Sequence, residues 1–126
     1  SILGLTIDYG PYGWIDNFDP DWTPNTTDLP GRRYRFGQQP QIAQWNLSCL
    51  AGALAPLFAD TAPLEDGLNQ FAAAYTAEAR AMTAQKLGLS RLRDEDTPLV
   101  GELYGLLARA EVDMTLWFRA LADVDA

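Results

Sequence analysis

The larger part of the chain has an apolar pattern with helical spacing. Between residues 41 and 122, apolar side chains return every three or four positions, which is the spacing of one face of an α-helix. This pattern predicts a helical body over residues 41–122. The apolar positions of its four segments are Ile42, Trp45, Cys49, Leu50, Leu54 and Leu57; Leu64, Leu68, Phe71, Tyr75, Ala79 and Met82; Leu99, Leu103, Leu106 and Leu107; and Leu116, Trp117, Ala120 and Leu121.

Local signals predict where these helices begin and end. Proline suits a first helical turn, Ser, Thr or Asp suits an N-cap, and glycine suits the position just after a helix. A charged linker, Ser90–Asp96, separates the second segment from the third. The predicted starts are Pro40, Pro63 with Thr61 or Ala62 near its cap, Thr97 as the cap before Pro98, and Asp113; the predicted stops are Pro56 and Gly88.

The first 40 residues have a different pattern. An apolar run with β-branched members predicts a buried strand over residues 1–10, which ends in Asp8-Tyr9-Gly10. Residues 11–40 combine prolines, aromatic residues and aspartates, and this composition predicts a long irregular loop. Loops of this length in compact domains are uncommon unless they are functional or held down. A functional segment and a packed connector with solvent-facing aspartates are both compatible with the pattern.

Composition and charge narrow the function classes. The 126 residues are 48% hydrophobic and 21% charged, which is typical of one globular domain. The net charge of −8 does not favour binding to nucleic acid or to an anionic membrane. The chain has no histidine, which excludes a Ser-His-Asp triad and histidine-ligated zinc within it. Its one cysteine, Cys49, cannot form an intrachain disulfide, and its helical position predicts a small buried residue, as Trp45 predicts core.

Two charged clusters lie in the loop. Asp16, Asp19 and Asp21 are spaced like the first acids of a calcium loop, but the glycine and the distal glutamate of that loop are absent. A solvated acidic loop is therefore the preferred interpretation.

The second cluster consists of Arg32, Arg33 and Arg35, interleaved with Tyr34 and Phe36. An aromatic-basic pattern of this kind is found in nucleic-acid-binding surfaces, but the acidic net charge argues against that function. Pairing with the preceding aspartates, which would pin the loop to the helical body, is the better interpretation.

Asp8 is the main candidate for chemistry. An aspartate followed by an aromatic residue and glycine at a strand exit is either an ordinary turn or a metal-binding motif of the kind that kinase-like enzymes use. A carboxylate that faces a triphosphate can hold Mg²⁺. The residues alone leave both interpretations open.

Four longer strings resemble the selenoprotein O family, also called the YdiU family. They are SILGLTIDYGPYGWID (Ser1–Asp16), GRRYRFGQQPQIAQWNLSCLAGAL (Gly31–Leu54), KLGL (Lys86–Leu89) and VDMTLWFRAL (Val112–Leu121). The resemblance implies a kinase-like (pseudokinase) fold that transfers AMP from ATP to Ser, Thr or Tyr hydroxyls of proteins. It implies that Asp8 is a ligand of Mg²⁺, or of Mn²⁺ in its place, and that residues 11–40 replace an activation segment. Trp45 and Asn46 fall in a shared WNL string, and Asp113 and Arg119 in the last string are expected to be structural, as a cap and a salt-bridge partner.

The resemblance also implies what the chain lacks. In the family, an Asn-Thr-Asp-Asn motif, a glycine-rich loop and an ATP-contacting lysine precede the position of Ser1. We therefore expect residues 1–126 to be a mainly α, helical piece of a protein-kinase-like C-terminal lobe, with no catalytic residue of its own and no activity alone. The expected partners of the whole protein are ATP and protein substrates, without nucleic acid or membrane. Its expected location is the cytoplasm in a bacterium and the mitochondrion in a eukaryote.

A helical protein-interaction or scaffold domain without nucleotide chemistry is the alternative. It predicts that Asp8 is only a turn residue. Transfer of UMP in place of AMP is a variant of the enzymatic interpretation.

Overall fold

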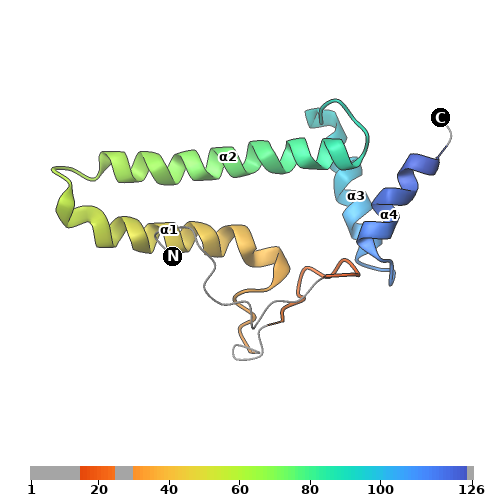
Figure 1. Ribbon diagram of the computed structural model, residues 1–126, viewed down its shortest axis with the longest axis horizontal. Helices are drawn as coiled ribbons and strands as arrows, with labels where there is room; N and C mark the ends of the chain where they lie inside the picture. The colour runs from red at the N-terminus through yellow and green to blue at the C-terminus, as the bar shows by residue number, and fades with distance from the viewer. Residues whose placement is uncertain (1–14, 25–29, 125–126) are drawn as a thin grey trace. The chain divides into compact units, whose positions relative to one another are not determined.

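The computed structural model describes residues 15–24 and 30–124. These residues are mainly helical, as predicted, and contain no strand; Asn17 and Asp113 form an isolated antiparallel bridge. The strand and the metal ligand predicted for residues 1–10 lie outside the described residues. The helices are α1 (Gln39–Leu54), α2 (Ala62–Lys86), α3 (Thr97–Leu107) and α4 (Met114–Ala120), with 3₁₀ turns at Phe36–Gln38, Ala55–Leu57, Asp94–Asp96 and Leu121–Asp123 (Figure 1).

The described residues form two compact units. The first contains residues 21–24 and 30–75, and the second contains residues 15–20 and 76–124. Helix α2 contributes its first part to one unit and its last part to the other. Each unit is described by itself below.

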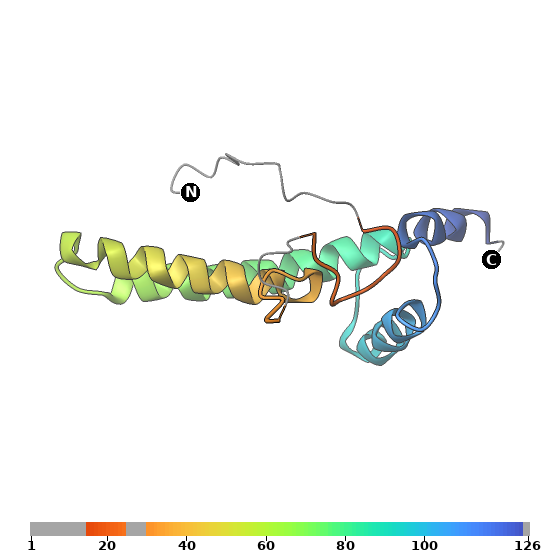
Figure 2. The ribbon, with the colours of Figure 1, turned by 90° about the horizontal axis from the view of Figure 1, so that it is seen from below.

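In the first unit, α1 and the beginning of α2 form an antiparallel helical hairpin (Figures 1 and 2). The connection between the two helices ends in a side-chain cap of α2, because Asp60 Oδ1 accepts a hydrogen bond from the Ala62 N–H at 2.6 Å. Pro40 and Pro63 lie in the first turns of the two helices, so both predicted starts are confirmed to within one residue. An apolar groove of about 230 Å³ lies between the helices, and its lining includes Leu50, Leu54 and Leu64.

In the second unit, α2 ends in a Schellman motif. Gly88 has a φ of +69°, the Leu89 N–H donates to the Ala84 carbonyl at 2.9 Å, and the Gly88 N–H donates to the Gln85 carbonyl at 3.1 Å. These bonds satisfy carbonyl groups that have no partner within the helix, and glycine is favoured because it adopts positive φ without strain. The prediction that Gly88 stops this helix is confirmed.

The starts of α3 and α4 test two predicted caps. The Asp113 carboxylate accepts a hydrogen bond from the Leu116 N–H at 2.8 Å, so Asp113 caps α4 as predicted. The prediction that Thr97 caps α3 is wrong, since its φ and ψ of −58° and −43° are already helical. The 3₁₀ turn Asp94–Asp96 continues directly into α3, and the N-cap position belongs to Asp96.

Burial is the main departure from the sequence predictions. Among the described residues, only the hydrophobic side chains Ala84 and Leu107 are buried, at 2% and 3% exposure, and both belong to the second unit. Trp45 is 48% exposed and Cys49 is also exposed, so the predictions of a core tryptophan and a buried thiol are wrong. A helical period identifies an apolar face, but the face is buried only where another element covers it.

Candidate functional site

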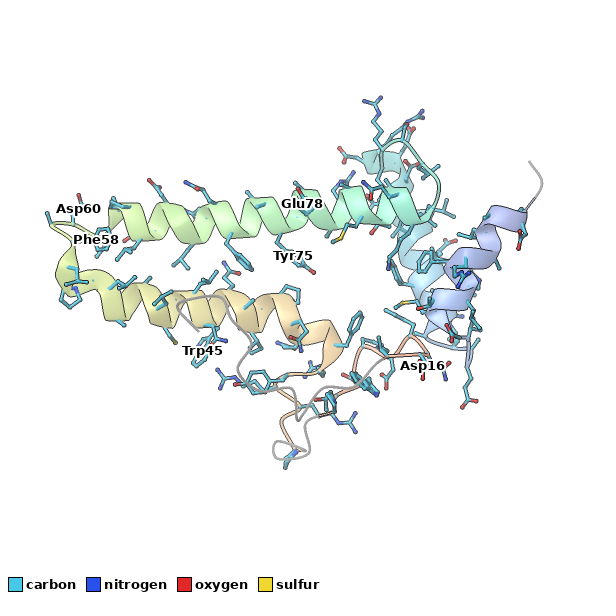
Figure 3. All side chains as sticks on the ribbon, viewed as in Figure 1. Asp16, Trp45, Phe58, Asp60, Tyr75 and Glu78 are labelled. Atoms are coloured by element: carbon cyan, nitrogen blue, oxygen red, sulfur yellow. The ribbon has the colours of Figure 1, made fainter. Side chains whose placement is uncertain are left out.

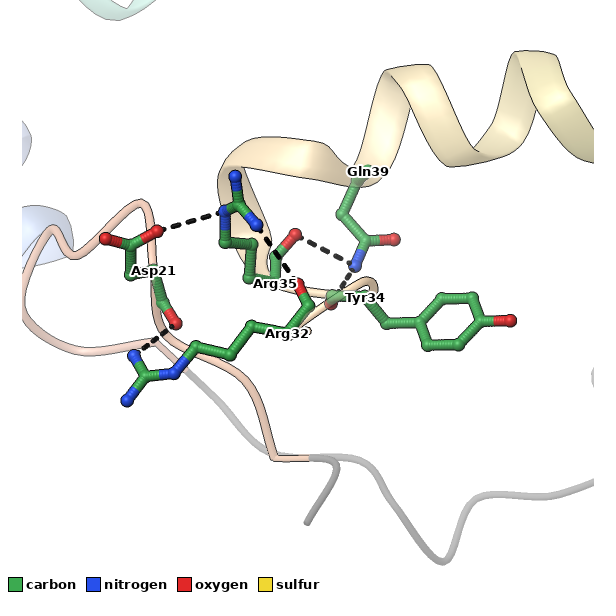
Figure 4. A network of polar contacts seen from close by, with 5 residues as sticks. All are labelled: Asp21, Arg32, Tyr34, Arg35 and Gln39. Carbon is green, nitrogen blue, oxygen red and sulfur yellow. Dashed lines mark hydrogen bonds and ion pairs between the residues drawn. The ribbon is translucent and has the colours of Figure 1, made fainter. Parts of the chain in front are cut away.

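In the first unit, residues of the loop before α1 form polar contacts with other residues of the same loop (Figure 4). Arg35 Nε lies 3.0 Å from Asp21 Oδ1, and Arg32 Nη1 donates to the Asp21 carbonyl at 3.2 Å. The Arg35 and Asp21 side chains are 33% and 65% exposed, so this ion pair contributes at most about 1 kcal/mol. The predicted pairing of the arginine cluster with a preceding aspartate is confirmed.

Hydrogen bonds to backbone carbonyl groups also hold this loop. The Phe36 N–H donates to the Trp22 carbonyl at 2.9 Å, and Gln39 Nε2, from the first turn of α1, donates to the Tyr34 carbonyl at 2.6 Å. Arg32 has a φ of +42°, which is rare for a residue with a side chain and costs about 1–2 kcal/mol. The Arg32 carbonyl accepts from the Arg35 N–H at 3.1 Å, which holds this conformation.

Arg33 connects the loop to α1. Its guanidinium carbon lies 3.9 Å from the centre of the Trp45 ring and 5.9 Å from the centre of the Tyr34 ring. A guanidinium over an aromatic face is attracted by the negative face of the ring, with a gain of about 0.5–2 kcal/mol. In Figure 3, Trp45 lies on the side of α1 that faces away from α2. Trp45 therefore holds the loop through the Arg33 guanidinium and does not fill a core between α1 and α2.

Three aspartates of the loop, Asp16, Asp19 and Asp21, are each exposed. No cluster of three or more His, Cys, Asp or Glu side chains among the described residues could hold a metal ion. The exposure of the three aspartates is compatible with the interpretation as a solvated acidic loop, and Asp21 in addition pairs with Arg35. Asp8, the predicted metal ligand, lies outside the described residues.

In the second unit, residues 16–18 are attached to the start of α4 and to α3. The Met114 N–H donates to the Asp16 carbonyl at 2.7 Å, and the Phe18 and Tyr104 rings lie 5.1 Å apart. Asp113 therefore has the structural role that was predicted for it. Arg119 is exposed and makes no ion pair with any described residue, so its predicted salt bridge is not formed there.

The second unit also contains an open hollow of about 830 Å³. It lies between the end of α2 and α4, and Lys86, Phe118 and Arg119 contribute to its lining. Lys86 Nζ lies 5.1 Å from the centre of the Phe118 ring, which orients the lysine across the hollow.

Sequence reasoning missed two organising side chains. Arg80, on α2, donates to the Leu92 carbonyl and to Asp94 Oδ1, both at 3.1 Å, and so holds the charged linker. Gln39 fixes the loop before α1, as described above. Neither has a sequence signature, because their partners are irregular backbone and an exposed acid. Asn46, which shares the WNL string with Trp45, is exposed on α1.

The chain is similar to proteins that are named as nucleotidyltransferases. The chain is 68% identical over 125 residues to "Protein nucleotidyltransferase YdiU" of Azoarcus sp., an alignment that covers 99% of this chain and 24% of the relative. Proteins of the same name from Xanthomonas oryzae pv. oryzae and Xanthomonas campestris pv. campestris are 65% and 64% identical over 124 residues, with 98% and 24% coverage in both cases. All three relatives are therefore named as nucleotidyltransferases.

Residues 1–126 also match the family model described as "Protein adenylyltransferase SelO". The chain belongs to this family, as the resemblance of its sequence strings implied. It spans about a quarter of the length of the curated relatives that it matches. Among the described residues, no helix is long and apolar enough to cross a membrane.

Proposed function

We propose that the chain is part of a protein adenylyltransferase that transfers AMP from ATP to Ser, Thr or Tyr hydroxyls of other proteins. The observation that carries the proposal is the match of the SelO family model to all of residues 1–126. The mainly helical described residues are compatible with a piece of a kinase-like C-terminal lobe. Because the relatives reported above are bacterial, we place the whole protein in the bacterial cytoplasm.

Asp8 has the metal-binding role in this proposal. Its carboxylate oxygen is a ligand type that Mg²⁺ and Mn²⁺ prefer. When bound, the ion would offset the negative charge of the triphosphate of ATP. Nucleotide transfer of this kind depends on positioning and charge neutralisation more than on covalent chemistry. The contacts made by Asp21, Arg33 and Arg35 hold the segment before α1, which the resemblance assigns to the place of an activation segment.

Substitution of Asp8 in the full-length protein tests the proposal. We expect both Asp8→Ala and Asp8→Asn to lower AMP transfer by about 10²- to 10³-fold, because each removes a charged ligand. Asp66→Asn, an equal change at an exposed position of α2, is the matched control and should leave transfer unchanged. The measurement is incorporation of labelled AMP into protein with Mg²⁺ in excess, paired with a thermal melt. Near-normal transfer by both Asp8 variants would eliminate the metal-binding role.

Two further measurements distinguish AMP transfer from UMP transfer, and an enzyme from a scaffold domain. Labelled UTP in the same assay distinguishes UMP transfer from AMP transfer. The purified 126-residue chain should transfer neither nucleotide, since the resemblance assigns the ATP-contacting lysine to a preceding segment. A scaffold domain without nucleotide chemistry predicts no transfer by the full-length protein either, and no effect of the Asp8 substitutions on any nucleotide-dependent property.

A further inference from the structure

Helix α1 differs from α2 in its charge. Residues 36–59, which contain α1, include no Asp, Glu, Lys or Arg, whereas the whole chain is 21% charged. In the same unit, the first part of α2 carries Glu65 and Asp66, which are both exposed. A helix that faces water normally carries charged side chains on its outer side, whereas charged side chains are almost never fully buried. By this criterion α2 has the composition of a surface helix, and α1 has that of an internal helix.

One side of α1 is uncovered in the described residues. Figure 3 shows Trp45 on the side that faces away from α2. Positions three, four and seven residues from Trp45 share this side, because an α-helix makes one turn in 3.6 residues. We call this side the outer face of α1. Its residues, which are all exposed, are Gln41, Trp45, Ser48, Cys49 and Gly52.

The outer face contains residue types that proteins seldom leave in water. Trp45 is 48% exposed even with the Arg33 guanidinium 3.9 Å from its ring centre, and Cys49, of a residue type that is among the most often buried, is exposed. The described part of the first unit has no buried hydrophobic side chain, since Ala84 and Leu107 belong to the second unit. A unit of this size is marginal even with a complete core, because apolar burial must offset the conformational entropy of the chain. The first unit therefore needs a further cover.

The same polypeptide can supply this cover. The chain spans 24% of the relatives reported above, so those proteins are about four times as long. We propose that the outer face of α1 is an intramolecular interface, covered by segments of the whole protein outside residues 1–126. A segment of the same polypeptide is already held close to the face, whereas a separate molecule loses translational and rotational freedom when it binds. This inference does not depend on nucleotide transfer.

A separate protein partner fits the outer face less well. Charged groups around an interface steer a partner to its place and exclude wrong partners, and the outer face has no charged residue. Permanent interfaces are more hydrophobic and resemble a domain core cut in half. The composition of α1 is therefore that of a permanent contact within one protein.

The reactivity of Cys49 in the purified full-length protein tests the inference. The reagent is N-ethylmaleimide, and mass spectrometry follows the labelling of the peptide that contains each thiol. The matched control is Asn69→Cys, which introduces a thiol at an exposed position of α2, four residues after Glu65 and three after Asp66. We expect Cys49 to react about 100-fold more slowly than the thiol introduced at position 69, because a covered thiol reacts only when the cover opens.

Insertion of a charge gives a second measurement. Ser48→Lys places an ammonium group on the outer face of α1, and Asn69→Lys places one on the charged side of α2. In thermal unfolding of the full-length protein, Ser48→Lys should lower the midpoint by on the order of 5 °C, because a buried charge without a partner is costly. Asn69→Lys should change the midpoint by less than about 1 °C, as is usual for surface substitutions.

Three results would overturn the inference. The first is labelling of Cys49 in the full-length monomer as fast as that of the thiol introduced at position 69. The second is protection of Cys49 only at concentrations at which light scattering detects a dimer, since the face would then belong to a contact with a second copy. The third is equal protection in the 126-residue chain alone, because the cover would then lie within this chain. Absence of nucleotide transfer bears only on the proposed function.

Discussion

Replacing Gly67 and Gly88 by alanine makes the same chemical change inside α2 and just beyond its end, with opposite expected effects on stability. Gly88 has a φ of +69°, whereas Gly67 lies inside the helix, and at neither position would an added Cβ meet an atom within 4 Å. Alanine in the left-handed region costs about 1–2 kcal/mol, of which the stiffer unfolded chain offsets about 0.4–1 kcal/mol. Gly88→Ala should therefore destabilise by about 1 kcal/mol, and Gly67→Ala should stabilise by about 0.5–1 kcal/mol.

Urea unfolding of the 126-residue chain, followed by far-UV circular dichroism, measures both free energies of unfolding. Hydrogen exchange of the Leu89 amide, which donates to the Ala84 carbonyl, gives a local measurement of the same helix end. Exchange of this amide should become faster in Gly88→Ala and should not become faster in Gly67→Ala. Equal signs for the two variants, or unchanged exchange at Leu89 in Gly88→Ala, would refute the assignment of a left-handed C-terminal cap.

Three further predictions concern the cap, the core and the thiol. Asp113→Ala should destabilise by about 1 kcal/mol, because it leaves the Leu116 N–H without its side-chain acceptor, and Asp113→Asn, a good N-cap, should retain most of the stability in urea unfolding. Leu107→Ala should cost about 2–4 kcal/mol as a buried truncation, whereas Leu106→Ala, at an exposed neighbour, should cost well under half as much. Cys49 should react with a thiol-specific aromatic disulfide in the folded chain as quickly as after unfolding, since it is exposed, and strong protection in the folded state would contradict this.

The positions of the helices were predictable because their signals are local. Pro40, Pro63, Gly88 and Asp113 each act on backbone groups within a few residues of themselves. The resemblance of four sequence strings to one family was also a property of the sequence alone, and the family model confirmed it. Thr97 was assigned wrongly because a 3₁₀ turn before α3 moved the cap by one residue.

The sequence predicted an ion pair between an arginine and an aspartate of the loop, but not which residues form it. The arginine cluster was expected to pair with one of the preceding aspartates, but three acids were available and only the folded loop selects Asp21 for Arg35. The contacts that Arg80 makes with Leu92 and Asp94 depend on the path of the linker, which no periodic pattern encodes.

The sequence by itself determined that the described part of this protein is mainly helical, where most of its helices begin, and to which family the chain belongs. The tertiary structure decided which apolar residues are buried: Ala84 and Leu107 are, whereas Trp45 and Cys49 are exposed. It also decided that Trp45 stacks on Arg33. The reason is the range of the interactions. Caps and helical hydrogen bonds join residues a few positions apart, whereas burial depends on which distant segment covers a face.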